Sequence, residues 1–293
     1  MKRLFTCLLV LLLSLTTWAQ AEFSFPDVFL PEGEAPVSTE TSYQSANVSI
    51  NLTSMRVENA DVFVADIYVR DLSCYQRRFA GKWNKTKKLS VKNWALQESA
   101  VLAMTGDSSV ESFSLGWVVG NGTVMRDSPN AKRDLAFLFT NGEMRTILAQ
   151  DIDYDWLSAE VEAGNIWHIF CFGPALLDED GKALTKFNSE VQRNNPRSVI
   201  GYYEPGHYCF VQVDGRSTKS KIEAKKTNKG LNMTQLAKLM EDIGCKAAYN
   251  LDGGQSSVMW FNGSVVSTPD KNGRALSDVV LIIDPDSAEK ADE

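Results

Sequence analysis

The feature that most restricts the fold is a series of Asn-Gly dipeptides set among apolar stretches. They begin at Asn121, Asn141, Asn262 and Asn272, and the first three are flanked by apolar residues on both sides. Asparagine and glycine tolerate the positive φ angles that a two-residue hairpin turn requires. The sequence therefore predicts three β-hairpins at these positions and a further turn at Asp180-Gly181.

Four segments before these turns predict regular structure. Residues 48–52 and 62–69 are rich in branched and aromatic side chains with partial alternation, which indicates β-strands. Residues 72–80 and 91–99 predict short helices.

The most regular helical pattern covers residues 233–243, where apolar side chains recur at helical spacing. Thr234 is the expected N-terminal cap, and Gly244 is suited to end the helix. The helix leads into residues 245–251, which predict a buried strand. Many strands with few helices, in an order that does not alternate regularly, indicate an α+β fold with a strand-rich mixed sheet and several hairpins.

The first residues have the features of a secretory signal peptide. Lys2 and Arg3 precede an apolar run over residues 4–15, and Ala19-Gln20-Ala21 predicts cleavage after Ala21. The run is shorter than the roughly 20 residues that cross a bilayer, so we expect no stable membrane span after cleavage. An uncleaved anchor is the alternative. The expected location is secreted, cell-surface or periplasmic.

The rest of the chain divides into three expected parts. Residues 22–46 contain several prolines and no apolar period, which predicts an extended leader. Residues 47–285 are expected to form a single catalytic domain, and residues 286–293 a polar tail. The oligomeric state is left open.

Charge and cysteine content exclude some functions. The net charge of −7 argues against a nucleic-acid partner. With only two histidines and no Cys-x-x-Cys pair, we expect no zinc site of the common type, and no metal or cofactor is predicted. Export would permit disulfides, and three pairings remain open among Cys74, Cys171, Cys209 and Cys245.

The segment Asn250-Leu251-Asp252-Gly253-Gly254 follows the predicted buried strand. The strand would hold the Asp252 carboxylate in place, and glycines would leave room for a substrate and direct backbone N–H groups at an anion. Ser256 and Ser257 add hydroxyl donors. The alternative is an ordinary tight turn with a capping aspartate.

Two arginines at expected strand ends favour the first interpretation. Arg197 follows Asn195-Pro196 at the start of an apolar run, and Arg216 lies in an Asp-Gly-Arg turn after another. Arginine presents a planar fork that matches phosphate oxygens. Each arginine alone could be a structural ion-pair partner. Together, beside a glycine-rich turn, they predict a phosphate site.

The order of these motifs resembles the bacterial phosphodiester glycosidase family, which shares its catalytic domain with the animal enzyme that uncovers mannose 6-phosphate by removing N-acetylglucosamine. The resemblance extends over roughly residues 60–283. The segments that carry it are residues 103–107, 172–176, 195–201, 213–217 and 248–257.

The resemblance implies hydrolysis of a sugar-1-phosphodiester between the anomeric carbon and a phosphate oxygen, on an exported glycan or cell-surface polymer. A phosphate leaving group needs cationic and N–H stabilisation, which Arg197, Arg216 and the Gly253-Gly254 backbone would supply. The anomeric centre becomes oxocarbenium-like and attracts a carboxylate. Asp252 is the first candidate, with Asp107 or Asp214 as the second. The remaining expected substrate contacts are Asn250, Thr105, Ser256 and Ser257.

Two residues depart from the family pattern. Thr105 stands where relatives commonly have asparagine, and Gln255 stands where a third glycine is usual. Threonine lacks the amide and glutamine adds bulk. Either change predicts an altered substrate choice or a loss of activity.

Two other functions remain open. A secreted, non-catalytic binder of anionic glycans would keep the fold and the arginines. A metal-dependent phosphodiesterase would use Asp107, Asp214 and Asp252 as ligands. A lysine-rich segment, residues 217–230, predicts either a flexible lid that attracts an anionic substrate or a solvated surface loop.

Overall fold

The structure is a computed structural model that describes residues 22–285 except 26, 81–87, 108–115 and 130–131. The expected signal peptide, residues 1–21, and the expected polar tail, residues 286–293, lie outside the described residues. Among the described residues, no helix combines the length and the apolar composition that a membrane span requires.

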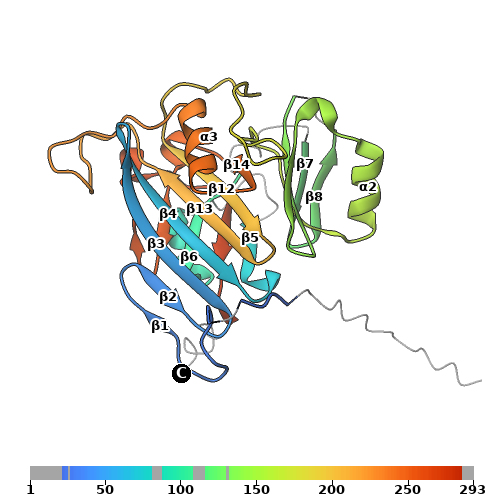
Figure 1. Cartoon of the computed structure of the whole chain (residues 1–293), viewed down its shortest axis with the longest axis horizontal. Coiled ribbons are helices and arrows are strands. Elements are labelled where there is room, and N and C mark those ends of the chain that lie inside the picture. Colours follow the sequence, from blue (N-terminus) through green and yellow to red (C-terminus); the bar gives the residue numbers. More distant parts are fainter. Residues whose placement is uncertain (1–21, 26, 81–87, 108–115, 130–131, 286–293) are drawn as a thin grey trace, which may run out of the picture.

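A seven-stranded antiparallel sheet forms the centre of the molecule (Figure 1). Its strands, in spatial order, are β1 (Val37–Ser38), β2 (Ser42–Gln44), β3 (Val48–Val57), β4 (Ala60–Val69), β13 (His207–Val213), β12 (Arg197–Glu204) and β14 (Ala247–Asn250). In β4, Val62 and Val64 pack under helix α3 (Met233–Asp242), whereas Phe63 and Ala65 face the opposite core. Because both faces are covered, the strand is apolar almost throughout.

Two five-stranded antiparallel sheets complete the fold. The sheet that packs against the central one contains β16 (Ser264–Val265), β15 (Met259–Phe261), β6 (Leu102–Thr105), β17 (Asp278–Ile282) and β5 (Tyr75–Phe79). The other, at the side of the central sheet in Figure 1, contains β10 (Met144–Ile147), β9 (Leu135–Phe139), β11 (Ile166–Phe170), β7 (Gly116–Gly120) and β8 (Thr123–Ser128).

Helices cover the outer faces of these sheets. Helix α1 (Val91–Gln97) buries Trp94 against the sheet that contains β6, and α2 (Tyr154–Glu162) buries Leu157 against the sheet that contains β9. Short 3-10 turns are η1 (Leu72–Cys74), η3 (Ala149–Asp151), η4 (Gly254–Ser256) and η5 (Asp270–Asn272). The predicted α+β, strand-rich architecture is confirmed.

The three predicted hairpins are also confirmed. Asn121-Gly122 joins β7 to β8, Asn141-Gly142 joins β9 to β10, and Asn262-Gly263 joins β15 to β16. The fourth pair, Asn272-Gly273, ends the η5 turn instead. At Asp180-Gly181, the chain turns between the bridged residues 177 and 183.

Two local predictions were wrong. Residues 72–80 form one 3-10 turn followed by strand β5, because pairing with β17, some 200 residues away, outweighs the local helical pattern. Helix α3 is capped by Asn232 rather than Thr234; the Asn232 side chain accepts a hydrogen bond from Gln235 N, and the Gln235 side chain reciprocates in a capping box. The end of α3 at Gly244, with φ +84°, agrees with the prediction.

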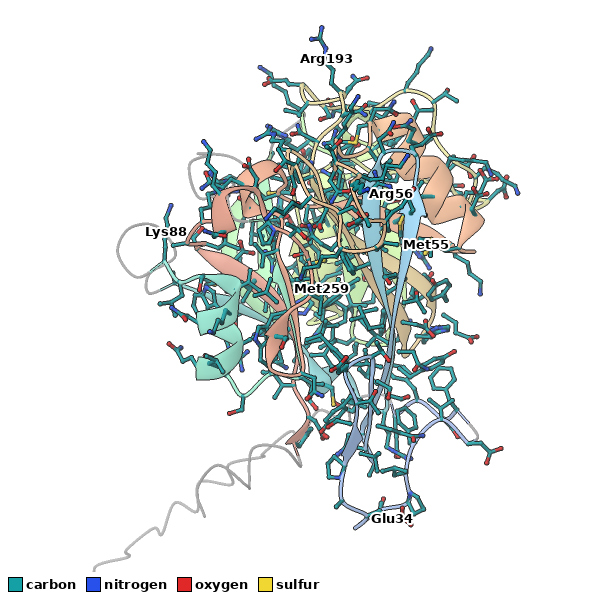
Figure 2. The ribbon with its side chains drawn as sticks, turned by 90° about the vertical axis from the view of Figure 1, so that its left-hand side faces the viewer. Glu34, Met55, Arg56, Lys88, Arg193 and Met259 are labelled. Atoms are coloured by element: carbon teal, nitrogen blue, oxygen red, sulfur yellow. The ribbon has the colours of Figure 1, made fainter. Side chains whose placement is uncertain are left out.

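The expected leader, residues 22–46, is part of the folded domain. Strand β2 extends the central sheet by pairing with β3, and Phe23 and Tyr43 are buried in the main core. Figure 2 shows Glu34 at the end of the molecule opposite Arg193. The expected boundary at residue 47 therefore falls inside a continuous sheet. The sequence pattern did not reveal strands β1 and β2, because they are short, lack an apolar period and are held by backbone pairing.

Candidate active site

Three strand ends of the central sheet meet at one edge. Strand β12 runs antiparallel to both neighbours, with Arg197 opposite Val213 and Val199 opposite Asn250. The start of β12 therefore lies beside the ends of β13 and β14. This register explains why motifs far apart in sequence converge.

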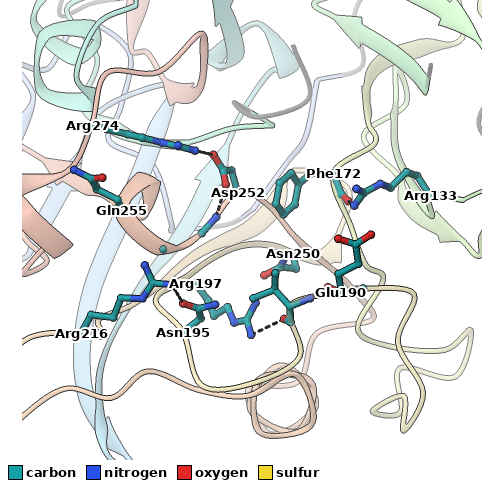
Figure 3. A pocket seen from close by; sticks show the side chains of 14 residues that line it. Arg133, Phe172, Glu190, Asn195, Arg197, Arg216, Asn250, Asp252, Gln255 and Arg274 are labelled. Carbon is teal, nitrogen blue, oxygen red and sulfur yellow. Dashed lines mark hydrogen bonds and ion pairs between the residues drawn. The ribbon is translucent and has the colours of Figure 1, made fainter. Parts of the chain in front are cut away.

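A pocket of about 410 Å³ opens at this edge (Figure 3). Its lining contains four arginines but only two acidic side chains, although the whole chain is acidic. The lining residues are Arg133, Phe172, Ser189, Glu190, Val191, Asn195, Arg197, Arg216, Asn250, Asp252, Gly253, Gly254, Gln255 and Arg274. The pocket is therefore suited to an anionic ligand.

The Asp252 carboxylate is held by three donors. Its Oδ2 accepts hydrogen bonds from Ser256 Oγ at 2.6 Å and Arg274 Nη2 at 2.8 Å, and its Oδ1 accepts one from Gly253 N at 2.9 Å. The side chain is 8% exposed. These three hydrogen bonds fix the orientation of the Asp252 carboxylate at the pocket wall.

Arg274 was missed by the sequence analysis. It follows three residues with left-handed backbone, Lys271, Asn272 and Gly273, with φ of +49°, +65° and +77°. Its Nε also donates to Ser256 Oγ at 2.6 Å, so one side chain contacts both Ser256 and Asp252. The fourth Asn-Gly pair, Asn272-Gly273, was the one local signal for this residue, because it predicts a tight turn directly before Arg274.

Arg197 is a buried cation bound only to backbone carbonyls. It donates to the oxygens of Leu231 at 3.2 Å, Val191 at 3.0 Å and Arg193 at 2.7 Å. Among the described residues, no carboxylate lies within ion-pair distance of it. Burial, and then the charge of nearby Arg216, lower the pKa of Arg197 to about 10. The guanidinium stays charged at neutral pH, and a bound anion would compensate it.

Arg216 and two asparagines complete this side of the pocket. Arg216 is half exposed and donates to Asn195 Oδ1 and, at 3.3 Å, to Asp270 Oδ2. Asn250 donates from Nδ2 to the carbonyl oxygen of Gly173 at 2.8 Å, whereas its buried Oδ1 has no hydrogen-bond partner. An unpaired acceptor at a pocket wall suits a hydroxyl donor of a ligand.

Gly253 and Gly254 line the pocket, but their N–H groups do not point to a free anion site. Gly253 N donates to Asp252 Oδ1, and Gly254 N donates to the carbonyl oxygen of Pro196 at 3.0 Å. The expected N–H cradle at these two residues is therefore wrong. Gly253 allows two backbone segments to approach closely, because a Cβ there would lie 2.7 Å from Pro196 O. Gly254 is needed for its backbone conformation, since its φ is +63°.

Three of the expected substrate contacts lie behind the pocket wall. The Thr105 hydroxyl donates to the carbonyl oxygen of Ser256 and accepts from Val258 N at 3.3 Å. Ser257 Oγ lies 3.1 Å from Ser198 Oγ, and Ser256 Oγ donates a hydrogen bond to Asp252 Oδ2. All three are buried and do not line the pocket. They are structural because their hydroxyls are already paired.

Asp107 is also buried behind the pocket rather than in it. Its Oδ2 accepts from Cys171 N at 2.8 Å and lies 3.5 Å from Arg77 Nη2. Burial raises the pKa of Asp107 to about 7; Arg77 opposes the rise and the nearby Asp278 adds to it. As a candidate for the second carboxylate, Asp107 does not reach the pocket.

Asp214 fails as the second carboxylate for the same reason. It is 1% exposed and accepts from Thr268 N at 2.7 Å, so it holds a neighbouring loop. Burial raises the pKa of Asp214 to about 6. The second carboxylate that lines the pocket is instead Glu190, on the Arg133 side in Figure 3. No local motif marked Glu190, because it lies in an irregular segment.

The model of the phosphodiester glycosidase family matches residues 98–283. The chain belongs to this family. The resemblance inferred from the motifs is thereby confirmed, and family membership supports phosphodiester glycosidase chemistry in general.

Solved structures with a similar fold include an enzyme domain, a hypothetical protein and a putative exported protein. The catalytic domain of zebrafish N-acetylglucosamine-1-phosphodiester alpha-N-acetylglucosaminidase, auto-inhibited by its pro-peptide, is 19% identical, with a TM-score of 0.58 over 81% of this chain and 83% of that chain. A hypothetical protein from Synechocystis is 11% identical, with a TM-score of 0.53 over 81% and 62%. A putative exported protein from Burkholderia pseudomallei is 14% identical, with a TM-score of 0.51 over 77% and 74%.

One curated relative is a SPbeta prophage-derived uncharacterized protein of Bacillus subtilis. It is 24% identical over 208 residues, which is 69% of this chain and 30% of the relative. The chain therefore spans less than a third of that protein.

Gln255, which was expected to depart from the family pattern, lines the pocket. Gln255 Nε2 donates to the carbonyl oxygen of Gly273 at 3.3 Å, next to Arg274. The added side chain therefore joins the two turns that hold Asp252.

Within the described ranges, no group of three or more His, Cys, Asp or Glu residues is arranged to hold a metal ion.

The four cysteines of the described domain are buried free thiols. Cys209 Sγ and Cys245 Sγ lie 3.6 Å apart. No such sulfur–sulfur contact is found between Cys74 and Cys171, both of which are described residues. None of the four lines the pocket.

Proposed function

We propose that this member of the phosphodiester glycosidase family hydrolyses sugar-1-phosphodiesters by breaking the bond between the anomeric carbon and a phosphate oxygen. The observation that carries the proposal is that one pocket contains both a fixed aspartate and a buried arginine that has no carboxylate partner in the described part of the chain. Arg197 suits the phosphate, and Asp252 suits the positive charge that develops at the sugar.

The leaving phosphate would lie against Arg197 and Arg216. As the carbon–oxygen bond breaks, its electron pair passes to the phosphate oxygen, and both guanidiniums stabilise that charge. A strong acid is not required, because a phosphate is already a stable anion. Arginines at this side of the pocket are therefore a better match to the chemistry than a protonated carboxyl.

The sugar would lie between Asp252 and the Phe172 side of the pocket (Figure 3). Arg274 and Ser256 hold Oδ2 of Asp252 in place beside the sugar. The unpaired Oδ1 of Asn250 would accept a hydrogen bond from a sugar hydroxyl. These contacts favour the oxocarbenium-like transition state over the bound substrate, which is the requirement for a higher rate.

Glu190 is the proposed base. A water proton passes to its carboxylate while the water oxygen bonds to the anomeric carbon, and the products are the free sugar and a phosphate monoester. Glu190 is exposed, so the proton returns readily to solvent. Asp107 and Asp214, both buried, have no such access.

The test is hydrolysis of the methyl phosphodiester of N-acetylglucosamine 1-phosphate in oxygen-18 water. N-acetylglucosamine is chosen because the name of the zebrafish relative specifies it. We expect the label in the sugar and a loss of at least about a hundredfold in kcat for Asp252→Asn. Label in the phosphate, or equal turnover by the variant, would overturn the proposal.

We also propose that the protein acts outside the cytoplasm, on an exported glycan or cell-surface polymer. The signal-like residues 1–21 and the likeness to a putative exported protein support this location. N-terminal sequencing of the protein recovered from a secreting host should begin at Glu22. A mature protein that retains Met1 in the cytoplasm would contradict it.

A further inference from the structure

A strongly basic loop projects from the edge of the pocket. This basic arm, residues 216–229, is the orange loop at the left of Figure 1. Its only acidic residue is Glu223, whereas the chain as a whole has a net charge of −7. Its basic residues are Arg216, Lys219, Lys221, Lys225, Lys226 and Lys229. Positive charge is therefore concentrated on one part of an acidic protein.

The base of the arm is tied down, unlike a flexible lid. Asp61, which is fully buried, accepts hydrogen bonds from Arg56 Nη1 at 2.6 Å, Ser220 Oγ at 2.7 Å, Lys221 N at 2.7 Å and Asn228 Nδ2 at 3.2 Å. Ser217 and Asn228 also pair through their backbones. The base of the arm is therefore fixed to the strand that carries Asp61.

Three lysines of the arm are available to a ligand. Lys226 is 3.6 Å from Glu223, and the Lys221 ammonium donates to backbone carbonyls. In contrast, Lys219, Lys225 and Lys229 are exposed, and no described carboxylate lies within ion-pair distance of them. The described residues therefore leave the charges of these three lysines without an ion-pair partner.

The arm is continuous with the proposed phosphate site. Arg216 is its first residue and also lines the pocket, where its charge lowers the pKa of Arg197. Positive charge thus extends from the buried Arg197, through Arg216, to the exposed lysines. A ligand that matches this arrangement has one anion in the pocket and further anions outside it.

We propose that the basic arm binds a polymeric substrate, a glycan chain with repeating phosphodiester groups, one of which occupies the pocket while its neighbours lie on the arm. This inference rests on the proposed function and specifies its substrate class. Repeated phosphates along a chain release counterions when lysines neutralise them, so the arm would strengthen binding in proportion to chain length.

A glycan polymer fits better than a nucleic acid. Proteins that bind single-stranded nucleic acid combine basic grooves with aromatic side chains on which bases stack. Residues 216–229 contain no aromatic residue, and Phe172 is the single aromatic residue among those that line the pocket. The arm can therefore neutralise phosphates but offers no stacking surface for bases.

The test compares chain lengths with an inactive protein, so that binding is measured without turnover. The probes are oligomers of N-acetylglucosamine 1-phosphate joined by phosphodiester bonds, with two and with eight units, bound to full-length Asp252→Asn protein. Lys219→Glu/Lys225→Glu is the arm variant. Lys92→Glu/Lys246→Glu, at exposed sites elsewhere, changes the net charge equally and serves as the control.

We expect the eight-unit oligomer to bind at least about tenfold more tightly than the two-unit oligomer at low salt, with a steeper salt dependence. The arm variant should lose this length advantage, and the control should keep it. An absent length advantage, an equal loss in both variants, or tighter binding of an eight-nucleotide single strand would overturn the inference.

The same measurements separate this inference from the proposed function. If the eight-unit oligomer binds through the arm but the wild type releases no sugar from it, hydrolysis is wrong and the arm assignment stands. If the wild type hydrolyses the two-unit oligomer and chain length has no effect, the arm assignment is wrong and hydrolysis stands.

Discussion

Arg274 Nη2 lies 2.8 Å from Asp252 Oδ2, and Nε of the same guanidinium lies 2.6 Å from Ser256 Oγ. The carboxylate at the centre of the pocket is thus fixed by an arginine 22 residues further along the chain. A planar guanidinium makes both contacts from one orientation, which a lysine ammonium would not reproduce.

Removal of this guanidinium should reduce catalysis more than substrate binding. For Arg274→Met we expect kcat to fall about ten- to a hundredfold with a smaller change in KM, because Asp252 loses its orientation and its ionic partner. Arg274→Lys should recover part of kcat because the charge returns. Steady-state kinetics on the methyl phosphodiester provide the measurement, and an increase in KM alone would show that Arg274 only binds substrate.

Arg197 should determine phosphate recognition. We expect Arg197→Met to lower kcat/KM about a hundredfold or more and to abolish inhibition by a phosphate monoester product, because the buried cation has no substitute. Arg193→Met is a matched control, since the Arg193 side chain is exposed at the end of the molecule (Figure 2). Unchanged product inhibition in the Arg197 variant, measured on folded protein, would exclude a phosphate site there.

Glu190 should be replaceable by an external nucleophile if it activates water. We expect Glu190→Ala to lose about a hundredfold or more in kcat. Added azide, which needs no base, should restore turnover and give a sugar azide. The control is Glu179→Ala, an exposed glutamate that lines a different groove. Loss of activity without any azide product would assign Glu190 to binding only.

The buried Asp107 should make stability fall as pH rises. Burial raises its pKa from 3.8 to about 7, so the folded state holds a proton that the unfolded state has released. The stability from this proton is fully present below about pH 4 and is lost as pH rises through about 7. Asp107→Asn removes this dependence, so its Tm relative to wild type should increase between pH 4 and 8. A constant difference across that range would contradict the assignment.

Asp61 should anchor the basic arm. Burial alone would raise its pKa, but hydrogen bonds from Ser220, Arg56, Lys221 and Asn228 outweigh this effect and lower it. Its contribution to stability is therefore present above the unfolded value of 3.8 and is lost as pH falls below it.

At neutral pH, we expect Asp61→Ala to speed tryptic cleavage within the arm about tenfold, because the freed loop opens locally at lower cost. Asp66→Asn, a partly exposed aspartate on the same strand, should leave the cleavage rate unchanged. Equal cleavage rates in both variants would show that Asp61 does not hold the arm.

Features set by neighbouring residues were predictable from the sequence. The Asn-Gly turns at Asn121, Asn141 and Asn262 form hairpins because their φ angles depend on local chemistry. Helix α3 follows its apolar spacing for the same reason. The strand-end positions of Arg197 and Asp252 also followed from the apolar runs beside them.

The role of each polar side chain was decided by the tertiary structure. The Thr105 hydroxyl donates to the carbonyl oxygen of Ser256, 151 residues away, and the buried Asp107 carboxylate accepts from Cys171 N, 64 residues away, so neither side chain reaches the pocket. Arg274 and Glu190 reach the pocket from irregular segments that carry no periodic signal. Local sequence determines turns and strands, whereas burial and hydrogen-bond partners depend on which distant strands pair, and these decide which carboxylates meet the substrate.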